Sequence, residues 1–187
     1  MKVKWLFASL FLLAGCALSW AQASKPAEHP TVTQILDGSL GSVESEFVPA
    51  AEAMPEDKYS FAPTGGEFKG VRTFAQQIKH VAAVNYLLGG GILQEKPPVD
   101  TGGENGPASV TSKADIVKYL KDSFAYLHKA VNSIDEKNQV AAVKSPFGDG
   151  QASRLGLAVG AISHPNDHYG QMVVYLRMNG IVPPASR

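Results

Sequence analysis

The chain has 187 residues, and its 17 basic and 17 acidic residues give zero formal charge and a pI near 7.0. This length predicts one domain, and the 44% hydrophobic and 18% charged content excludes a disordered tail, a collagen and a coiled coil. A neutral charge argues against nucleic-acid binding, which needs clustered Lys and Arg. The single cysteine excludes an internal disulfide and a thiolate zinc site, so any metal depends on imidazole and carboxylate ligands.

The first residues have the pattern of an export signal. Lys2 and Lys4 precede an apolar run over residues 5–13, which is too short to span a bilayer comfortably. Ala21-Gln22-Ala23 matches a signal-peptidase site, and we favour cleavage after Ala23. The alternative is a lipoprotein anchored through Cys16, since Leu13-Ala14-Gly15-Cys16 resembles a lipobox. We therefore expect a signal peptide over 1–23, a linker over 24–30, and a periplasmic or secreted protein.

The first half of the remaining chain predicts two helices. Apolar residues at helical spacing indicate a helix over about 31–54, and a loop rich in turn formers follows over 55–70. A second helix is expected over 71–88, with Gly89-Gly90-Gly91 as its stop. Proline and glycine between residues 94 and 110 then predict a long connection without periodicity.

The second half predicts two more helices. Ser112 begins a helix whose apolar stripe extends to Ile134, and residues 135–150 break the pattern. Ser153 caps a fourth helix that extends to Asn179. No strand pair shows sustained alternation. We therefore predict an all-α domain over 31–187, a four-helix bundle with a long crossover loop.

Three histidines fall on inward-facing stripes of the predicted helices. His164 and His168 are four residues apart, so they project from one face of the fourth helix and could ligate one ion. His80 lies on the core-facing side of the second helix and could supply a third imidazole, which would give a three-ligand site with an open position. His29 and His128, in contrast, are expected to be solvated.

Pro165 bears on both the chemistry and the helix of the His pair. A metalloprotease H-E-x-x-H motif requires Glu directly after the first His, where this chain has Pro165, so that class is excluded. A proline inside a helix also predicts a kink beside His164. Alternatively, the fourth helix begins near Ser163, and Pro165 lies in its first turn.

Two sequence blocks resemble the DinB/YfiT-like superfamily. The first is Phe74-Ala75-Gln76-Gln77-Ile78-Lys79-His80-Val81-Ala82, and the second is His164-Pro165-Asn166-Asp167-His168-Tyr169-Gly170-Gln171 followed by Tyr175-Leu176-Arg177. The resemblance implies a four-helix bundle in which His80, His164 and His168 hold a divalent metal, nickel or zinc. It also implies a metal-dependent transferase, isomerase or hydrolase activity. Most similar proteins are cytoplasmic, whereas this chain carries an export signal.

We carry two functional hypotheses from the sequence. The first is a metal-dependent hydrolase or transferase, acting on an unidentified small-molecule substrate, in which the ion polarises a carbonyl or activates water. The second is a non-catalytic protein that binds a metal or small ligand. No general base is assigned, because Asp167, Asn85 and Tyr169 are only neighbours of the candidate ligands. A homodimer is expected because symmetric pairs are the commonest soluble assembly.

Overall fold

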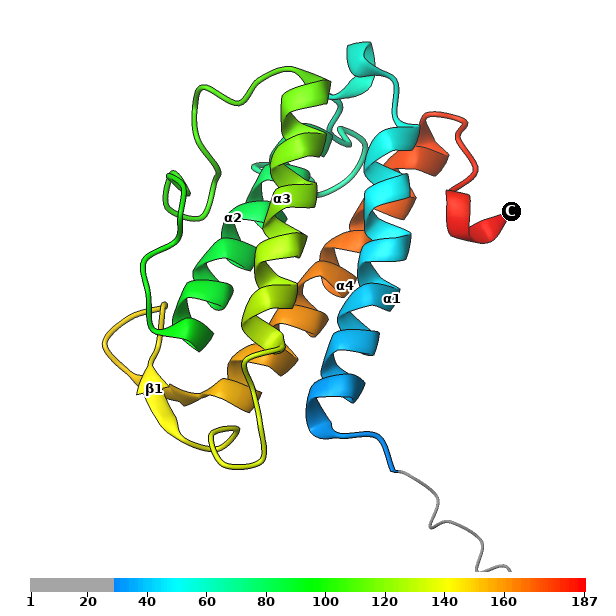
Figure 1. The fold of residues 1–187 in the computed structure, drawn as a ribbon. Helices are drawn as coiled ribbons and strands as arrows, with labels where there is room; N and C mark the ends of the chain where they lie inside the picture. The colour runs from blue at the N-terminus through cyan, green and yellow to red at the C-terminus, as the bar shows by residue number, and fades with distance from the viewer. Residues whose placement is uncertain (1–28) are drawn as a thin grey trace, which may run out of the picture.

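A computed structural model of the chain describes residues 29–187. The described part is a bundle of four α-helices, as predicted: α1 (Val32–Ala53), α2 (Phe74–Leu93), α3 (Lys113–Val131) and α4 (Arg154–Met178) (Figure 1). Single 3-10 turns cover Glu56–Lys58 and Pro184–Ser186. The expected signal peptide and Cys16 lie outside the described residues. No helix within the described range is both long and apolar enough to cross a membrane.

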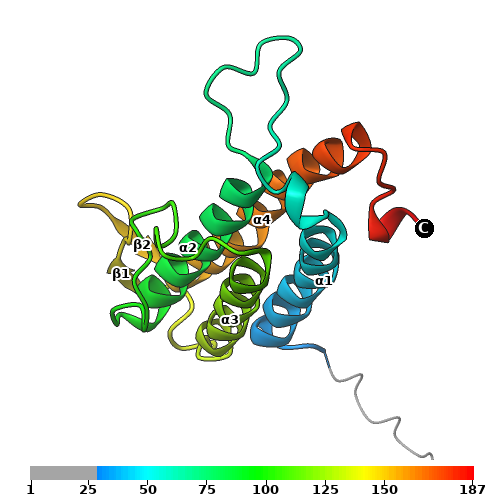
Figure 2. The ribbon, with the colours of Figure 1, turned by 90° about the horizontal axis from the view of Figure 1, so that it is seen from above.

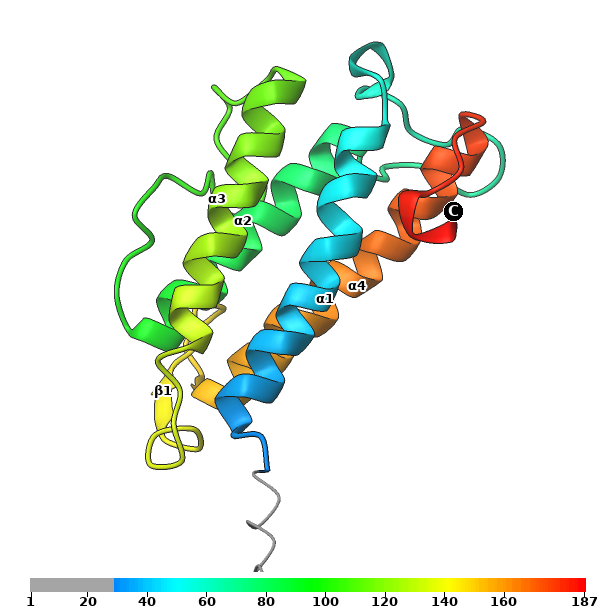
Figure 3. The ribbon, with the colours of Figure 1, turned by 45° about the vertical axis from the view of Figure 1, so that its right-hand side comes forward.

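The four helices pack in a ring in which α2 and α1 each lie against α3 and α4. Figure 2 shows the same arrangement from above, and Figure 3 shows it turned by 45° about the vertical axis. The connection between α2 and α3 runs back along the bundle, so these two helices are parallel and α1 and α4 point the opposite way (Figure 1). This connection, residues 94–112, is the predicted long crossover, and we call it the crossover loop.

Side-chain caps fix where the helices begin. Thr31 and Thr73 open α1 and α2 with capping boxes, each closed by a Gln at the third helical position. Ser112 and Ser153 cap α3 and α4, as their positions before apolar runs predict. Each cap satisfies backbone N–H groups that a helix end otherwise leaves without partners.

The predicted stop at the three glycines is wrong, because α2 continues through them to Leu93 and ends at Gln94, which adopts the left-handed conformation with φ 57°. The glycines serve close packing instead. A Cβ atom on Gly89 would lie 2.7 Å from the Tyr126 ring, and one on Gly91 would lie 2.9 Å from Pro146. Their missing side chains let α3 and the segment around Pro146 approach α2.

Residues 135–153 also differ from the prediction, since they contain two short antiparallel strands, β1 (Ala142–Lys144) and β2 (Gln151–Ser153). At three residues each, the strands are too short for alternation to be visible in the sequence. The hairpin is attached to α2, because the backbone N–H of Lys144 donates to Gln94 Oε1 at 3.0 Å. β2 leads directly into α4, which therefore begins at the base of the bundle.

The fourth helix is continuous. Pro165 lies inside α4, as the first of the two alternatives predicts, and not in the first turn of a helix that begins near Ser163. The Asn166 side chain donates to the carbonyl of Ile162 at 3.1 Å. This continuity keeps His164 and His168 one turn apart on a single rigid element.

Candidate metal centre

The structure brings His80 from α2 together with His164 and His168 from α4. The three ring centroids lie 4.6–4.9 Å apart, and one nitrogen from each ring lies within 4.8 Å of the other two. His80 and His168 are buried and His164 is half-buried. Within residues 29–187 this is the one group of at least three His, Cys, Asp or Glu side chains that could hold a metal ion.

Two of the three rings are held by oxygen acceptors at Nδ1. His80 Nδ1 lies 2.6 Å from the backbone carbonyl of Glu104 in the crossover loop, and His168 Nδ1 lies against Gln77 Oε1. An imidazole that donates from Nδ1 presents an unprotonated Nε2, the form that binds a metal. The nearby oxygens therefore select the tautomer that a metal site requires.

The acceptor of His168 is itself positioned by further hydrogen bonds. Gln77 Nε2 donates to Gln171 Oε1 at 2.8 Å, and Gln171 Nε2 donates to Asp167 Oδ2 at 3.1 Å. These bonds fix which end of each amide faces its neighbour, because an amide nitrogen only donates and its oxygen only accepts. Asp167 thus orients His168 through two glutamines and not by direct contact.

His164 is the least constrained ring. Its Nδ1 is buried and has no hydrogen-bond partner among the described residues, while its Nε2 lies 3.1 Å from Nε2 of His80. Two nitrogens that bind one ion at about 2.0–2.1 Å are separated by about 2.9 Å at a right angle and about 3.4 Å at a tetrahedral angle. The observed separation falls between these values, so the distance between the two nitrogens is compatible with a shared ion.

The chemical environment keeps the rings uncharged. Burial lowers the pKa of His164 to about 3 and that of His168 to about 4, with further lowering from neighbouring imidazoles. Burial also lowers the pKa of His80, although the Glu104 carbonyl opposes the shift. The positive charge of Arg72 lowers all three pKa values. At neutral pH the cluster therefore offers lone pairs instead of protons, which fits a divalent ion of borderline softness.

A cavity of about 530 Å³ opens onto the cluster. Its walls include apolar side chains from Val84 and Leu88 of α2 and from Phe147. Glu104 and Ser163 contribute to the same lining, and Glu104 is its one acidic residue. An ion bound by the three histidines would thus face a space large enough for a small molecule.

Most of the other residues singled out from the sequence lie away from this cavity. Asn85 is buried and donates to Ser123 Oγ of α3 at 3.2 Å, and the half-buried Tyr169 packs against the hydrophobic core. His29 is exposed, as predicted. The prediction for His128 is wrong, because its ring nitrogens lie 2.6 Å from Asp37 and 3.1 Å from Glu44 on α1. The α1 carboxylates are distant in sequence, so helical spacing within α3 did not reveal them.

Three contributors to the site were missed from the sequence. Gln77 precedes His80 by three residues on the same stripe, and this spacing was the available signal for it. The Glu104 carbonyl and the Arg72 charge carry no comparable signal, because one is a backbone atom in an aperiodic loop and the other lies before the α2 cap.

Comparison with known proteins agrees with the fold. The sequence profile of the DinB superfamily matches residues 40–172. A DinB-like protein from Bacillus cereus superposes with a TM-score of 0.67 at 16% identity, covering 84% of this chain and 98% of that one. A DinB-like protein (YjoA) from Bacillus subtilis superposes with a TM-score of 0.60 at 17% identity, covering 78% of this chain and 92% of that one.

A conserved protein from Enterococcus faecalis gives a TM-score of 0.62 at 17% identity, covering 80% of this chain and 97% of that one. Comparison with functionally curated proteins gives no match. The structural matches show the shared fold, and the family match extends from α1 into α4 and includes all three histidines. The chain therefore belongs to the DinB superfamily.

Proposed function

We propose that the protein is a metal-dependent enzyme in which His80, His164 and His168 hold nickel or zinc. The observation that carries this proposal is the convergence of three uncharged imidazoles at the wall of a cavity. Three protein ligands leave at least one coordination position for water or substrate, as in catalytic zinc sites. When bound, such an ion supplies Lewis-acid chemistry to a carbonyl or to water.

The chain's own groups have distinct roles in this proposal. The Glu104 carbonyl and Gln77 orient two of the ligands, and Val84 and Leu88 give the cavity apolar walls. The Glu104 carboxylate is the proton acceptor we favour, since it belongs to the same lining and its charge raises the pKa of His80. The reaction class is hydrolysis or group transfer on a small molecule.

The first test is metal content. We expect about one nickel or zinc per chain in the purified protein by elemental mass spectrometry, and a large loss in His80→Ala, His164→Ala and His168→Ala. The matched control is His128→Ala, which removes an imidazole that contacts two carboxylates outside the cluster. Equal metal in the control and in all three cluster variants would contradict the assignment.

A second candidate is a non-catalytic metal-binding protein. It is favoured by one observation: the groups around the ligands are amides and a backbone carbonyl, and the one carboxylate of the cavity belongs to an exposed residue. Cobalt substitution separates the candidates. An absorption spectrum that changes on adding azide indicates an open coordination position, as the enzyme requires, whereas an unchanged spectrum indicates a closed site.

We further propose that the protein is exported. The basic and then apolar pattern of residues 1–13 and the Ala21-Gln22-Ala23 site support this location. Mass spectrometry of the protein recovered from a bacterial periplasm tests it. A chain that begins at Ser24 is expected, whereas a lipid-modified chain that begins at Cys16 would support the lipoprotein alternative, and an intact chain in the cytoplasm would contradict export.

A further inference from the structure

A second cavity, of about 690 Å³, lies at the start of α2. We call it the α2 cavity. It shares a wall with the histidine cluster, because Gln77 lines the α2 cavity and also accepts from His168 through Oε1. Its other polar side chains come from α2, α4, the crossover loop and the segment before α2. The polar lining is formed by Arg72, Gln76, Gln77, Lys79, Asn105 and Gln171.

The lining of the α2 cavity contains two cationic side chains and no carboxylate. Neither Arg72 nor Lys79 forms an ion pair among residues 29–187. By contrast, Lys121 and Lys129 on α3 each pair with a glutamate. Two uncompensated cations beside one cavity create a field that attracts anions.

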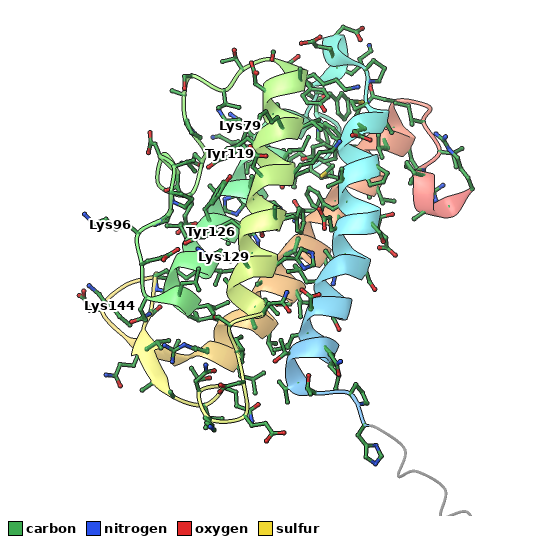
Figure 4. All side chains as sticks on the ribbon, viewed as in Figure 1. Lys79, Lys96, Tyr119, Tyr126, Lys129 and Lys144 are labelled. Carbon is green, nitrogen blue, oxygen red and sulfur yellow. The ribbon has the colours of Figure 1, made fainter. Side chains whose placement is uncertain are left out.

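Hydrogen bonds fix the backbone at Arg72 and the ammonium group of Lys79. The carbonyl of Arg72 accepts a hydrogen bond from the Tyr175 hydroxyl of α4 at 3.0 Å, directly before the cap of α2. Lys79 Nζ donates to the carbonyl of Pro107 at 2.7 Å, between α2 and the crossover loop (Figure 4). Gly106 makes this approach possible, because a Cβ at that position would lie 3.0 Å from Lys79 Cβ.

Amide groups complete the lining. Gln76 Oε1 accepts from the Thr73 backbone N–H, which directs the Gln76 side chain to the start of α2. The side-chain amide nitrogens Gln76 Nε2 and Asn105 Nδ2 make no hydrogen bond to the described part of the chain, so both can donate to a ligand. A guanidinium, an ammonium and two amides together suit carboxylate or phosphate oxygens.

We propose that the α2 cavity binds a small dianion through carboxylate or phosphate groups that contact Arg72 and Lys79. The site is separate from the metal ligands and does not depend on the proposed metal function. An anion that enters it lies beside Gln77 and Gln171, the two amides that position His168.

The test is titration calorimetry of the purified protein with succinate and, separately, with inorganic phosphate. Saturable binding of at least one of these anions is expected. The anion that binds more tightly shows whether the cavity prefers carboxylate or phosphate groups. Succinamide, the uncharged analogue, is expected not to bind. Arg72→Gln and Lys79→Gln should each weaken binding at least about tenfold, because each removes a charge-assisted hydrogen bond to the anion. Lys69→Gln, an exposed lysine outside the lining, is the matched control.

Three further measurements keep the outcomes distinct. Arg72→Lys restores the charge without the planar donors and is expected to recover part of the affinity, while thermal unfolding shows that each variant is folded. His164→Ala is expected to lose metal and keep succinate binding, so failure of the metal proposal would not affect this one. No saturable binding of either anion, equal binding of succinamide, or unchanged affinity in folded Arg72→Gln and Lys79→Gln would overturn the proposal.

Discussion

Gln77 gives the sharpest test of how the protein prepares its metal ligands. Gln77→Met keeps a side chain of similar length and removes both of its hydrogen bonds to side chains. It leaves the buried His168 Nδ1–H without an acceptor and Gln171 Oε1 without its donor at 2.8 Å. The ring of His168 is then free to rotate or to change tautomer, which removes Nε2 from the cluster for part of the time.

The expected magnitude follows from the position of Gln77 behind a ligand. Removing such a partner typically weakens metal binding about 10–100-fold, which is about 1.4–2.8 kcal/mol. The metal-free protein should also lose about 1–3 kcal/mol of unfolding free energy, because a buried donor loses its acceptor. Gln77→Glu retains an oxygen that accepts from His168, so its metal affinity should stay close to that of the wild type or exceed it.

The assay is a competition titration of the metal-free protein against a chromogenic zinc chelator, with denaturant unfolding measured in parallel. Gln151→Met, on the exposed edge of β2, is the matched control and should change neither quantity. A folded Gln77→Met protein that binds zinc as tightly as the wild type would refute the argument that Nδ1 acceptors organise this cluster.

Four other predictions concern stability. Gly89→Ala should destabilise the protein by about 1–3 kcal/mol in denaturant unfolding, because its Cβ would meet the Tyr126 ring at 2.7 Å. Gly38→Ala should stabilise the protein by about 0.5–1 kcal/mol in the same assay, because Gly38 is exposed on α1 with open space around it. His128→Ala should lower stability by about 1 kcal/mol, less at high salt, because it removes contacts between α3 and α1 that are partly exposed. The metal-free protein should lose stability as the pH falls below about 6.5 toward 4. In this range the histidines of the unfolded chain take up protons, whereas the folded His164 and His168, with pKa values of about 3 and 4, stay uncharged. Unfolding free energies that are equal at pH 7 and pH 5 would contradict this.

The parts of the fold that the sequence predicted are those with local signals. Thr31, Ser112 and Ser153 occupy cap positions before apolar stripes, and the helices begin there because capping depends on neighbouring residues. The end of α2 depends instead on distant residues. Gly89 is a helix breaker by propensity, but the Tyr126 ring of α3 occupies the space beside it, so tertiary packing overrides the local preference.

The same distinction applies to the site. His164 and His168 could be paired from their spacing, and His80 could be added because it lies on an inward stripe. The acceptor of His80 could not be predicted, because the Glu104 carbonyl reaches the ring only through the path of an aperiodic loop. The role of His128 was missed for a related reason, since its partners Asp37 and Glu44 lie on α1.

The crossover loop connects these observations, because it contributes to both cavities and to one ligand. Its Glu104 carbonyl fixes His80, and its Pro107 carbonyl holds Lys79 one position earlier on α2. Adjacent positions on a helix point about 100° apart. The two hydrogen bonds therefore attach the loop to two different sides of α2. Movement of the loop away from α2 would remove the acceptor that fixes the tautomer of His80. It would also remove the carbonyl that holds Lys79 beside the α2 cavity. The crossover loop therefore positions His80 and Lys79 as well as linking α2 to α3.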